Sequence, residues 1–124
     1  MNIHRQNISK LTEPLGPYTH VVQHGDVLYT SGFTAFGSDA QHDAIDQQAI
    51  AIFDQLKIVA SEMGSSLDKL IKVKIFVTEF EEMETLRDTL FSIYGAHIPA
   101  SSLIKIDQLF APELKIEIEA IFAR

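Results

Sequence analysis

The chain has 124 residues, a usual size for one domain, so we expect a single domain spanning residues 1–124. Its net charge of −7 and its ten scattered Lys and Arg residues disfavour nucleic acid or an anionic membrane as the main partner. Cysteine is absent, which excludes disulfides and thiolate chemistry, and neither an apolar span nor a leader segment is recognisable, so we expect a soluble cytoplasmic protein.

The first part of the chain predicts a β-hairpin. Residues 19–23 and 27–33 are rich in β-branched and aromatic side chains, and His24-Gly25-Asp26 between them is typical of a hairpin turn. A short extra strand is expected at residues 3–6. The intervening EPLGPY contains two prolines and a glycine, which exclude a helix or a central strand there.

A long helix is predicted over residues 44–63. Apolar side chains recur there at spacings of three and four residues, the pattern of a helix with one buried face. Asp43 is the expected N-cap and Gly64 the expected C-terminal stop. The apolar face consists of Ile45, Ala49, Ile52, Phe53, Leu56, Val59, Ala60 and Met63.

The second half of the chain predicts strands at residues 69–78, 101–107 and 114–123, with a second helix at residues 81–94. On the first of these strands we expect one apolar face, made of Ile71, Val73, Ile75 and Val77. The second helix has its own apolar side, made of Met83, Leu86, Leu90, Ile93 and Tyr94.

This order, β-β-α-β-α-β-β, predicts the α+β class, with a mixed sheet and two helices on one face. Both helices are expected on the same side because crossovers between parallel strands are right-handed. The other face of the sheet then needs a cover. A dimer or trimer with the sheets packed inward would supply one.

Glu119 in the last strand is the best candidate for a functional group. The strand face expected under the helices consists of Leu114, Ile116, Ile118, Ala120 and Phe122. The opposite face is polar at Lys115 and Glu117 and apolar from Ile121 onwards, so Glu119 is its last charge. Partial burial at the rim of an interface would suit it to general acid or base chemistry. A solvated surface glutamate is the alternative.

Ser31-Gly32 and Tyr18 are weaker candidates. The glycine allows a ligand to approach the backbone closely, and Ser31 can offer a hydrogen bond, although such pairs often only begin a loop. Tyr18 follows the rigid Gly16-Pro17 turn, and a packing role suits it equally well. The five histidines lack ligand spacing, and no phosphate-loop or hydrolase motif occurs, so no metal site is expected.

Several blocks together resemble the YjgF/RidA family along the whole chain. They are GPY (16–18), LYTSG (28–32), MGSSLDKLIKVKIFVTEF (63–80), HIPASS (97–102) and IEIEAIFAR (116–124). Each block alone is unspecific, but their order and spacing are specific. The resemblance implies a chorismate-mutase-like homotrimer with inward-facing sheets and a ligand pocket at each subunit interface.

The resemblance also implies an activity, the hydrolysis of 2-imino acids and enamines to 2-keto acids and ammonia without a metal or organic cofactor. By motif position, Tyr18, Ser31, Gly32 and Glu119 match pocket residues of the family. Glu119 and Ser31 are then the predicted catalytic residues, with Glu119 handling the attacking water. The expected partner is a small anionic or carbonyl/imine metabolite.

The sequence departs from the family at three pocket positions. Ser101 replaces the arginine that grips the substrate carboxylate, Leu103 replaces a cysteine, and Phe33 replaces a glutamine. A serine hydroxyl cannot reproduce a bidentate arginine–carboxylate contact. Arg87 stands where relatives carry a pocket asparagine, and we predict that it binds the anion instead. The alternative is that Arg87 lies on the surface and pairs with a neighbouring acidic residue.

Two functions follow from these features. The first is imine or enamine hydrolysis of altered specificity, with Phe33, Arg87, Ser101 and Leu103 lining the substrate pocket beside Tyr18 and Gly32. The second is a non-catalytic trimer that binds a small metabolite in a more apolar pocket. Chaperone and ribonuclease activities are also reported in the family, but the charge of −7 disfavours the latter.

Overall fold

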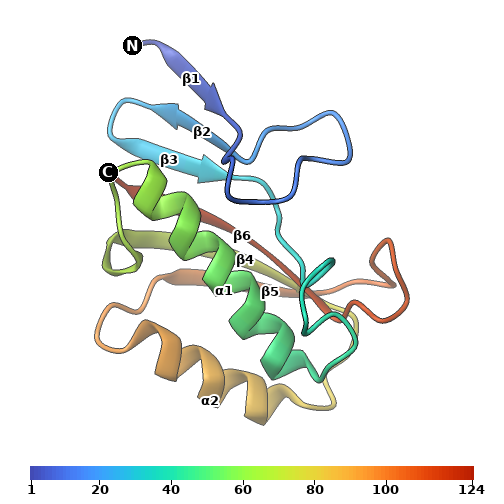
Figure 1. The fold of residues 1–124 in the computed structure, drawn as a ribbon. Helices are drawn as coiled ribbons and strands as arrows, with labels where there is room; N and C mark the ends of the chain where they lie inside the picture. Colours follow the sequence, from blue (N-terminus) through green and yellow to red (C-terminus); the bar gives the residue numbers. More distant parts are fainter.

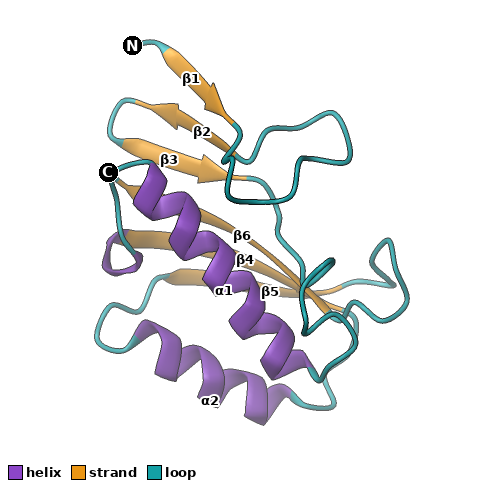
Figure 2. Cartoon of the chain, viewed as in Figure 1, coloured by secondary structure: helices purple, strands orange, loops and turns teal.

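The computed structural model describes residues 1–124 and contains one six-stranded sheet with two helices on one side (Figures 1 and 2). The sheet order is β1-β2-β3-β6-β4-β5, and only the β4–β5 pair is parallel. The predicted α+β class and element order are confirmed. The elements are β1 (Ile3–Gln6), β2 (Val21–His24), β3 (Val27–Thr30), α1 (Ile45–Glu62), the 3₁₀ turn η1 (Leu67–Lys69), β4 (Leu70–Val77), α2 (Met83–Tyr94), β5 (Ala100–Lys105) and β6 (Ile116–Ala123).

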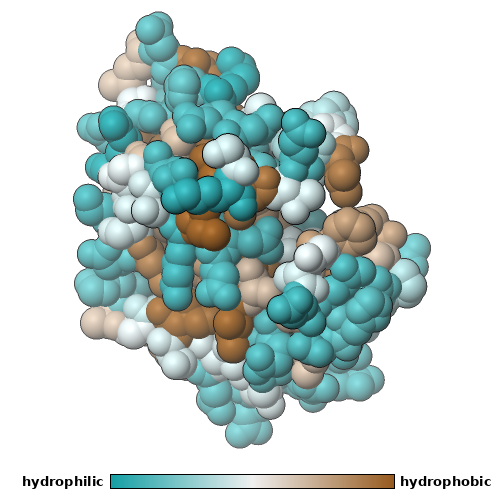
Figure 3. Space-filling model, in the orientation of Figure 1, coloured by the Kyte–Doolittle hydropathy of each residue, from teal (hydrophilic) through white to brown (hydrophobic).

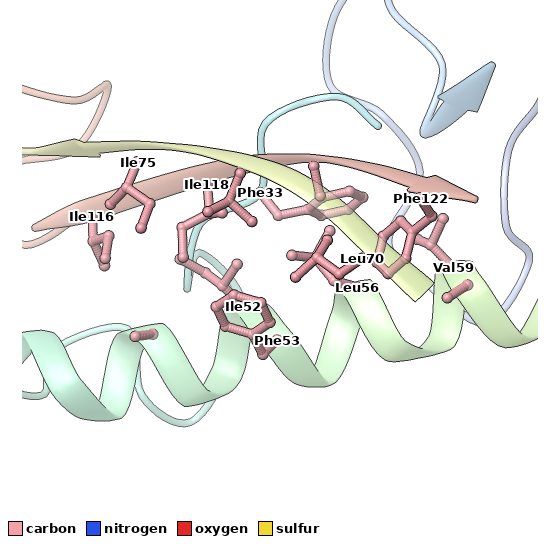
Figure 4. Close-up of a cluster of buried hydrophobic side chains, with 14 of the residues drawn as sticks. Phe33, Ile52, Phe53, Leu56, Val59, Leu70, Ile75, Ile116, Ile118 and Phe122 are labelled. Atoms are coloured by element: carbon pink, nitrogen blue, oxygen red, sulfur yellow. The ribbon is translucent and has the colours of Figure 1, made fainter. Parts of the chain in front are cut away.

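The core lies between the helices and the sheet (Figure 4). All eight residues of the predicted apolar face of α1 are buried, and so is every second residue of β6 from Ile116 to Phe122. In Figure 4, Ile52 and Leu56 extend from α1 toward the sheet, with Leu56 beside Leu70 of β4. Burying each such side chain contributes on the order of 2 kcal/mol, so the two local periodicities together define the helix-covered face.

A β-bulge in β4 corrects the predicted face of that strand. We expected Ile71 among the buried residues, but its side chain is 45% exposed and Leu70 is buried instead. Leu70 pairs with Phe122, whereas Lys72 pairs with Ile121, so one extra residue is accommodated between them. The alternation predicted from the sequence holds only after the bulge, from Val73 onwards.

The start of α1 differs from the predicted cap. Ala44, rather than Asp43, occupies the N-cap position, and no side chain caps the helix. The buried side chain of Gln48 instead holds the preceding loop, because its amide donates to the carbonyl oxygens of Gln41 (3.2 Å) and Asp43 (3.1 Å). The predicted stop at Gly64 is confirmed, since its φ of +76° suits a residue that ends a helix.

The helix-covered side of the molecule is mainly hydrophilic at its surface (Figure 3). Brown and tan atoms gather on its right flank, where the loop between β1 and β2 approaches the loop between β5 and β6 (Figures 1 and 3). No helix has both the length and the apolar character needed to cross a bilayer.

Candidate functional site

A local irregularity next to β3 creates the candidate site. We predicted a strand over residues 27–33, but β3 ends at Thr30. From Tyr29 to Phe33 the chain advances four residues, while its partner β6 advances three, from Ile121 to Ile118. The extra residue makes Ser31-Gly32 bulge away from β6, and the Thr30 hydroxyl fills the gap by accepting a hydrogen bond from the Ala120 amide at 3.0 Å.

Beside this bulge lies a pocket of about 510 Å³. Its walls come from the loop between β1 and β2, from the segment after β3, from α1, from the loop between β5 and β6, and from β6. Five predicted site residues line it together: Tyr18, Ser31, Gly32, Phe33 and Glu119. Residues far apart in the sequence therefore meet at one concave surface of ligand-binding size.

Glu119 lies on the sheet face that the helices leave open. Its neighbours Ile118 and Ala120 point into the core, and its own side chain is 42% exposed. Lys74 of β4 lies directly opposite in the antiparallel register, and its Nζ is 3.8 Å from Glu119 Oε1. Glu119 also borders a second hollow of about 310 Å³, which Lys72 and Lys74 line. The carboxylate of Glu119 thus lies between the 510 Å³ pocket and this second hollow.

Glu117 lines the pocket but was not among the predicted site residues. It shares the open face with Glu119, two residues along β6, and both line the pocket. Gly32 permits its position, because a Cβ on Gly32 would lie 2.8 Å from the Glu117 carboxyl. Burial, and secondly the charge of Glu119, raise the pKa of Glu117. The signal in the sequence was the spacing of two on one strand face.

The backbone holds Ser31 and Tyr18 in place. The Ser31 hydroxyl donates to the carbonyl oxygen of Thr19, and the Ser31 amide donates to that of His20 at 3.0 Å. Because its hydroxyl hydrogen is already used, the Ser31 oxygen can only accept a hydrogen bond from a ligand. Tyr18 is 47% exposed, and its ring lies against Gly16, whose Cβ position would be 3.4 Å away.

The raised pKa of Glu117 means that its charged form is disfavoured in the folded protein, which predicts an effect of pH on stability. We expect Glu117→Gln to raise the unfolding midpoint at pH 7 and to lose this advantage below about pH 4, near the ordinary glutamate pKa. A raised pKa in the folded state means that folding favours the protonated carboxyl. The contribution of protonated Glu117 to the free energy of unfolding is therefore complete below its pKa in the unfolded state and is lost as the pH rises through its pKa in the folded state. Glutamine does not titrate, so the variant does not lose stability in this way.

Urea unfolding of wild type and Glu117→Gln at several pH values measures this effect. Glu84→Gln, at an exposed position on α2, is the matched control and should follow wild type at every pH. A Glu117→Gln variant that is less stable than wild type by the same amount at pH 4 and pH 7 would contradict the expectation.

The other predicted pocket residues lie elsewhere in the chain. Arg87 is exposed on α2 and belongs to none of the three ion pairs, so the expected surface pairing with an acidic neighbour is not seen. Ser101 and Leu103 on β5 pair with Val73 and Ile75, whose side chains face the helices. They therefore point to the sheet face opposite Glu119, and none of these three residues lines the pocket.

Comparison with known proteins identifies the family. A family model described as Endoribonuclease L-PSP, the YjgF/RidA family, matches residues 8–123. The chain belongs to this family. Two YjgF/RidA relatives named 2-iminobutanoate/2-iminopropanoate deaminase are similar over most of their length. The one from Dermatophagoides farinae is 27% identical over 112 residues, 88% of this chain and 87% of the relative. The one from Escherichia coli strain K12 is 29% identical over 115 residues, 89% of each chain.

Solved structures show the same YjgF/RidA fold. The crystal structure of Rv2704 from Mycobacterium tuberculosis, described as a member of the YjgF/YER057c/UK114 family, matches with a TM-score of 0.85. The match covers 99% of this chain and all of that one at 22% sequence identity. The arrangement of six strands and two helices is therefore that of the family, as the resemblance predicted.

Proposed function

We propose that this protein is a cofactor-free hydrolase that converts 2-imino acids and their enamine tautomers into 2-keto acids and ammonia. The observation that carries the proposal is the gathering of Glu119, Ser31, Gly32 and Tyr18 around one pocket. Membership of the YjgF/RidA family and the names of the two deaminase relatives support it. A cytoplasmic setting is part of the proposal.

In the proposed reaction, Glu119 moves the proton of the attacking water. The substrate is an iminium, R–C(=NH₂⁺)–COO⁻. The carboxylate of Glu119 removes a proton from water while the water oxygen bonds to the imine carbon. The electrons of the C=N π bond move to the nitrogen, which gives a neutral carbinolamine. The protonated Glu119 then gives this proton to the amino group of the carbinolamine, and the C–N bond breaks. The hydroxyl proton leaves through Glu119 to the released ammonia, so iminium and water become ketone and NH₄⁺.

A homotrimer with inward-facing sheets is the second part of the proposal. In a single chain, Arg87 and Ser101 lie on α2 and β5, away from the pocket. The edge that they occupy exposes apolar side chains, which suits it to meet another copy. These exposed side chains are Phe91 (59%), Ile98 (58%), Leu103 (38%) and Ile104 (40%). A neighbouring copy would then bring Arg87 to the substrate carboxylate and complete the predicted site.

Cleavage of RNA, which the description of the family model mentions, has less support in this chain. Binding to the RNA backbone relies on Lys and Arg contacts with phosphates. No Lys or Arg lines the 510 Å³ pocket, and the chain has a net charge of −7.

The proposal is tested with 2-iminobutanoate released in the assay by a threonine dehydratase. We expect the purified protein to accelerate keto-acid release, and Arg87→Ala to raise KM about tenfold or more with a smaller effect on kcat, because it removes a charge-assisted contact. Arg5→Ala, in the edge strand β1, is the control and should resemble wild type.

Each outcome of this assay has a distinct meaning. If wild type does not accelerate release of the keto acid from 2-iminobutanoate or 2-aminoacrylate, the hydrolase proposal fails for these substrates and the non-catalytic binding alternative gains. Unchanged kinetics of Arg87→Ala would instead remove Arg87 from the substrate site. A monomeric mass in size-exclusion chromatography with light scattering would contradict the trimer.

A further inference from the structure

The pocket beside Gly32 has an unusual distribution of charge for a site that is expected to hold an anion. Three glutamates line it, Glu13, Glu117 and Glu119, and no Lys or Arg does. Lys74, whose Nζ is 3.8 Å from Glu119 Oε1, belongs to the neighbouring hollow on the open face. Within one chain, the walls of the pocket therefore attract positive charge.

His20, which also lines the pocket, supplies no positive charge in this arrangement. The Ile8 amide donates to His20 Nδ1 at 2.9 Å, so Nδ1 must present its lone pair. The other ring nitrogen, Nε2, lies 3.0 Å from the carbonyl oxygen of Thr12, so Nε2 carries the proton. These two contacts define a neutral imidazole that is tied to the backbone of the loop before β2.

Glu13 is exposed and belongs to no ion pair, whereas Glu117 is the half-buried acidic group in the pocket that lacks a counter-ion. None of the three ion pairs in the chain involves it, although its carboxyl is packed against Gly32. Burial and the charge of Glu119 both raise the pKa of Glu117. A cation bound between the two glutamates would relieve both effects, because it supplies the opposite charge that the protein does not provide.

Two aromatic rings that contact each other also line this pocket. Phe36 and Phe110 pack edge to face with 5.1 Å between ring centroids, although Phe36 is 42% exposed and Phe110 is 65% exposed. Both rings line the pocket together with Leu15 and Tyr18, which are also exposed. Exposed apolar side chains gathered around a hollow mark a binding surface for an apolar group.

We infer that this pocket takes an iminium or ammonium ion that carries an aryl or branched-alkyl arm, with the nitrogen against Glu117 and Glu119 and the arm against Phe36 and Phe110. The inference rests on the proposed function and names its substrate class. The preferred substrates are imines of large apolar amino acids rather than 2-iminobutanoate. The volume of about 510 Å³ accommodates such an arm.

Binding of three small probes tests the inference without catalysis. Isothermal calorimetry at pH 7 compares 2-phenylethylammonium, which has both features, with ethylammonium, which lacks the ring, and 3-phenylpropanoate, which has the opposite charge. We expect 2-phenylethylammonium to bind about tenfold tighter than either of the other two, because it gains both the ionic and the aromatic contact. Equal or tighter binding of 3-phenylpropanoate would overturn the inference.

Two variants assign the contacts. Phe110→Ala is expected to remove most of the advantage of 2-phenylethylammonium over ethylammonium. Glu117→Gln is expected to weaken both cations about tenfold without weakening 3-phenylpropanoate. Phe80→Ala and Glu84→Gln are the matched controls, since both residues are exposed and neither lines the pocket. Unchanged selectivity in both pocket variants would overturn the assignment.

Kinetics separate this inference from the proposed function. An amino-acid oxidase supplies the imines of phenylalanine and 2-aminobutanoate, and we expect kcat/KM to favour the phenylalanine-derived imine about tenfold. Acceleration of both imines without this preference overturns the inference and leaves the proposed function standing. Acceleration of neither imine, with 2-phenylethylammonium still bound selectively, overturns the proposed function alone.

Discussion

Glu119→Gln is expected to lower kcat for imine hydrolysis at least about a hundredfold, because a positioned general base contributes a factor of this size. Glutamine keeps the length and a hydrogen-bonding oxygen, so it can still hold a water molecule. It cannot accept the proton that the water must lose. KM should rise by no more than about tenfold, because Glu117, the apolar walls and Tyr18 still bind the substrate. Steady-state kinetics with dehydratase-generated imine measure both constants.

The control for this experiment is Glu84→Gln, which makes the same chemical change at an exposed position on α2. A kcat of Glu119→Gln within about threefold of wild type would remove Glu119 from the chemistry, since the expected factor is far larger. The 3.8 Å contact with Lys74 would then be the remaining role of Glu119.

The same variant gives a readout that is independent of turnover. Part of the upward shift in the pKa of Glu117 comes from the charge of Glu119. Glu119→Gln removes that charge, so the pKa of Glu117 should fall, yet stay above its ordinary value because burial is the larger cause. An NMR titration of the side-chain carboxyl of Glu117 checks this. A pKa that does not change would show that the two glutamates are not electrostatically coupled.

The elements with one clear periodicity were predicted well from the sequence. In α1 and β6, neighbouring positions of the same face decide which residues are buried, so Leu56 and Ile118 could be placed in the core from local spacing alone. Ile71 and Asp43 were placed wrongly. Ile71 is exposed because β4 has a bulge where it pairs with β6. Asp43 is not the cap because the side chain of Gln48 holds the loop before α1. Neither contact can be predicted from the spacing of apolar residues within one element.

The site shows the same limit. Periodicity placed Glu119 on the open face but did not bring Tyr18 and Ser31 to it, and only the family resemblance grouped the three. Glu117 had a signal, its spacing of two from Glu119 on one strand face. Its contact with Gly32 depends on the bulge after β3, which a pattern of strand residues does not reveal.

Gln48→Met is expected to destabilise the protein by roughly 3 kcal/mol, since it removes the side-chain partner of four part-buried backbone groups. Gln48 is fully buried near the start of α1. Its amide nitrogen donates to the carbonyl oxygens of Gln41 (3.2 Å), Asp43 (3.1 Å) and Glu113 (2.9 Å). Its oxygen accepts from the Lys115 amide at 2.9 Å.

The change to methionine keeps the shape and unbranched stem of the side chain, so packing is little disturbed. The two segments that Gln48 joins, the loop before α1 and the segment before β6, then lose this link, although Glu113 still contacts Gln41 and His42. Because a folded domain is stable by only about 5–15 kcal/mol, a loss of this size is a large fraction of the total. The loss should appear as a lower urea midpoint at fixed protein concentration.

Gln47→Met is the matched control, one position earlier on the same helix, where the side chain is exposed. It should change the free energy of unfolding by no more than about 0.5 kcal/mol, as is usual for surface substitutions. If Gln48→Met were as mild as Gln47→Met, the polar groups of the two segments would have to find other partners in the folded state. Glu119 lies on β6, which follows directly from the segment that Gln48 holds, so kcat measured below the unfolding midpoint should also fall when this link is lost.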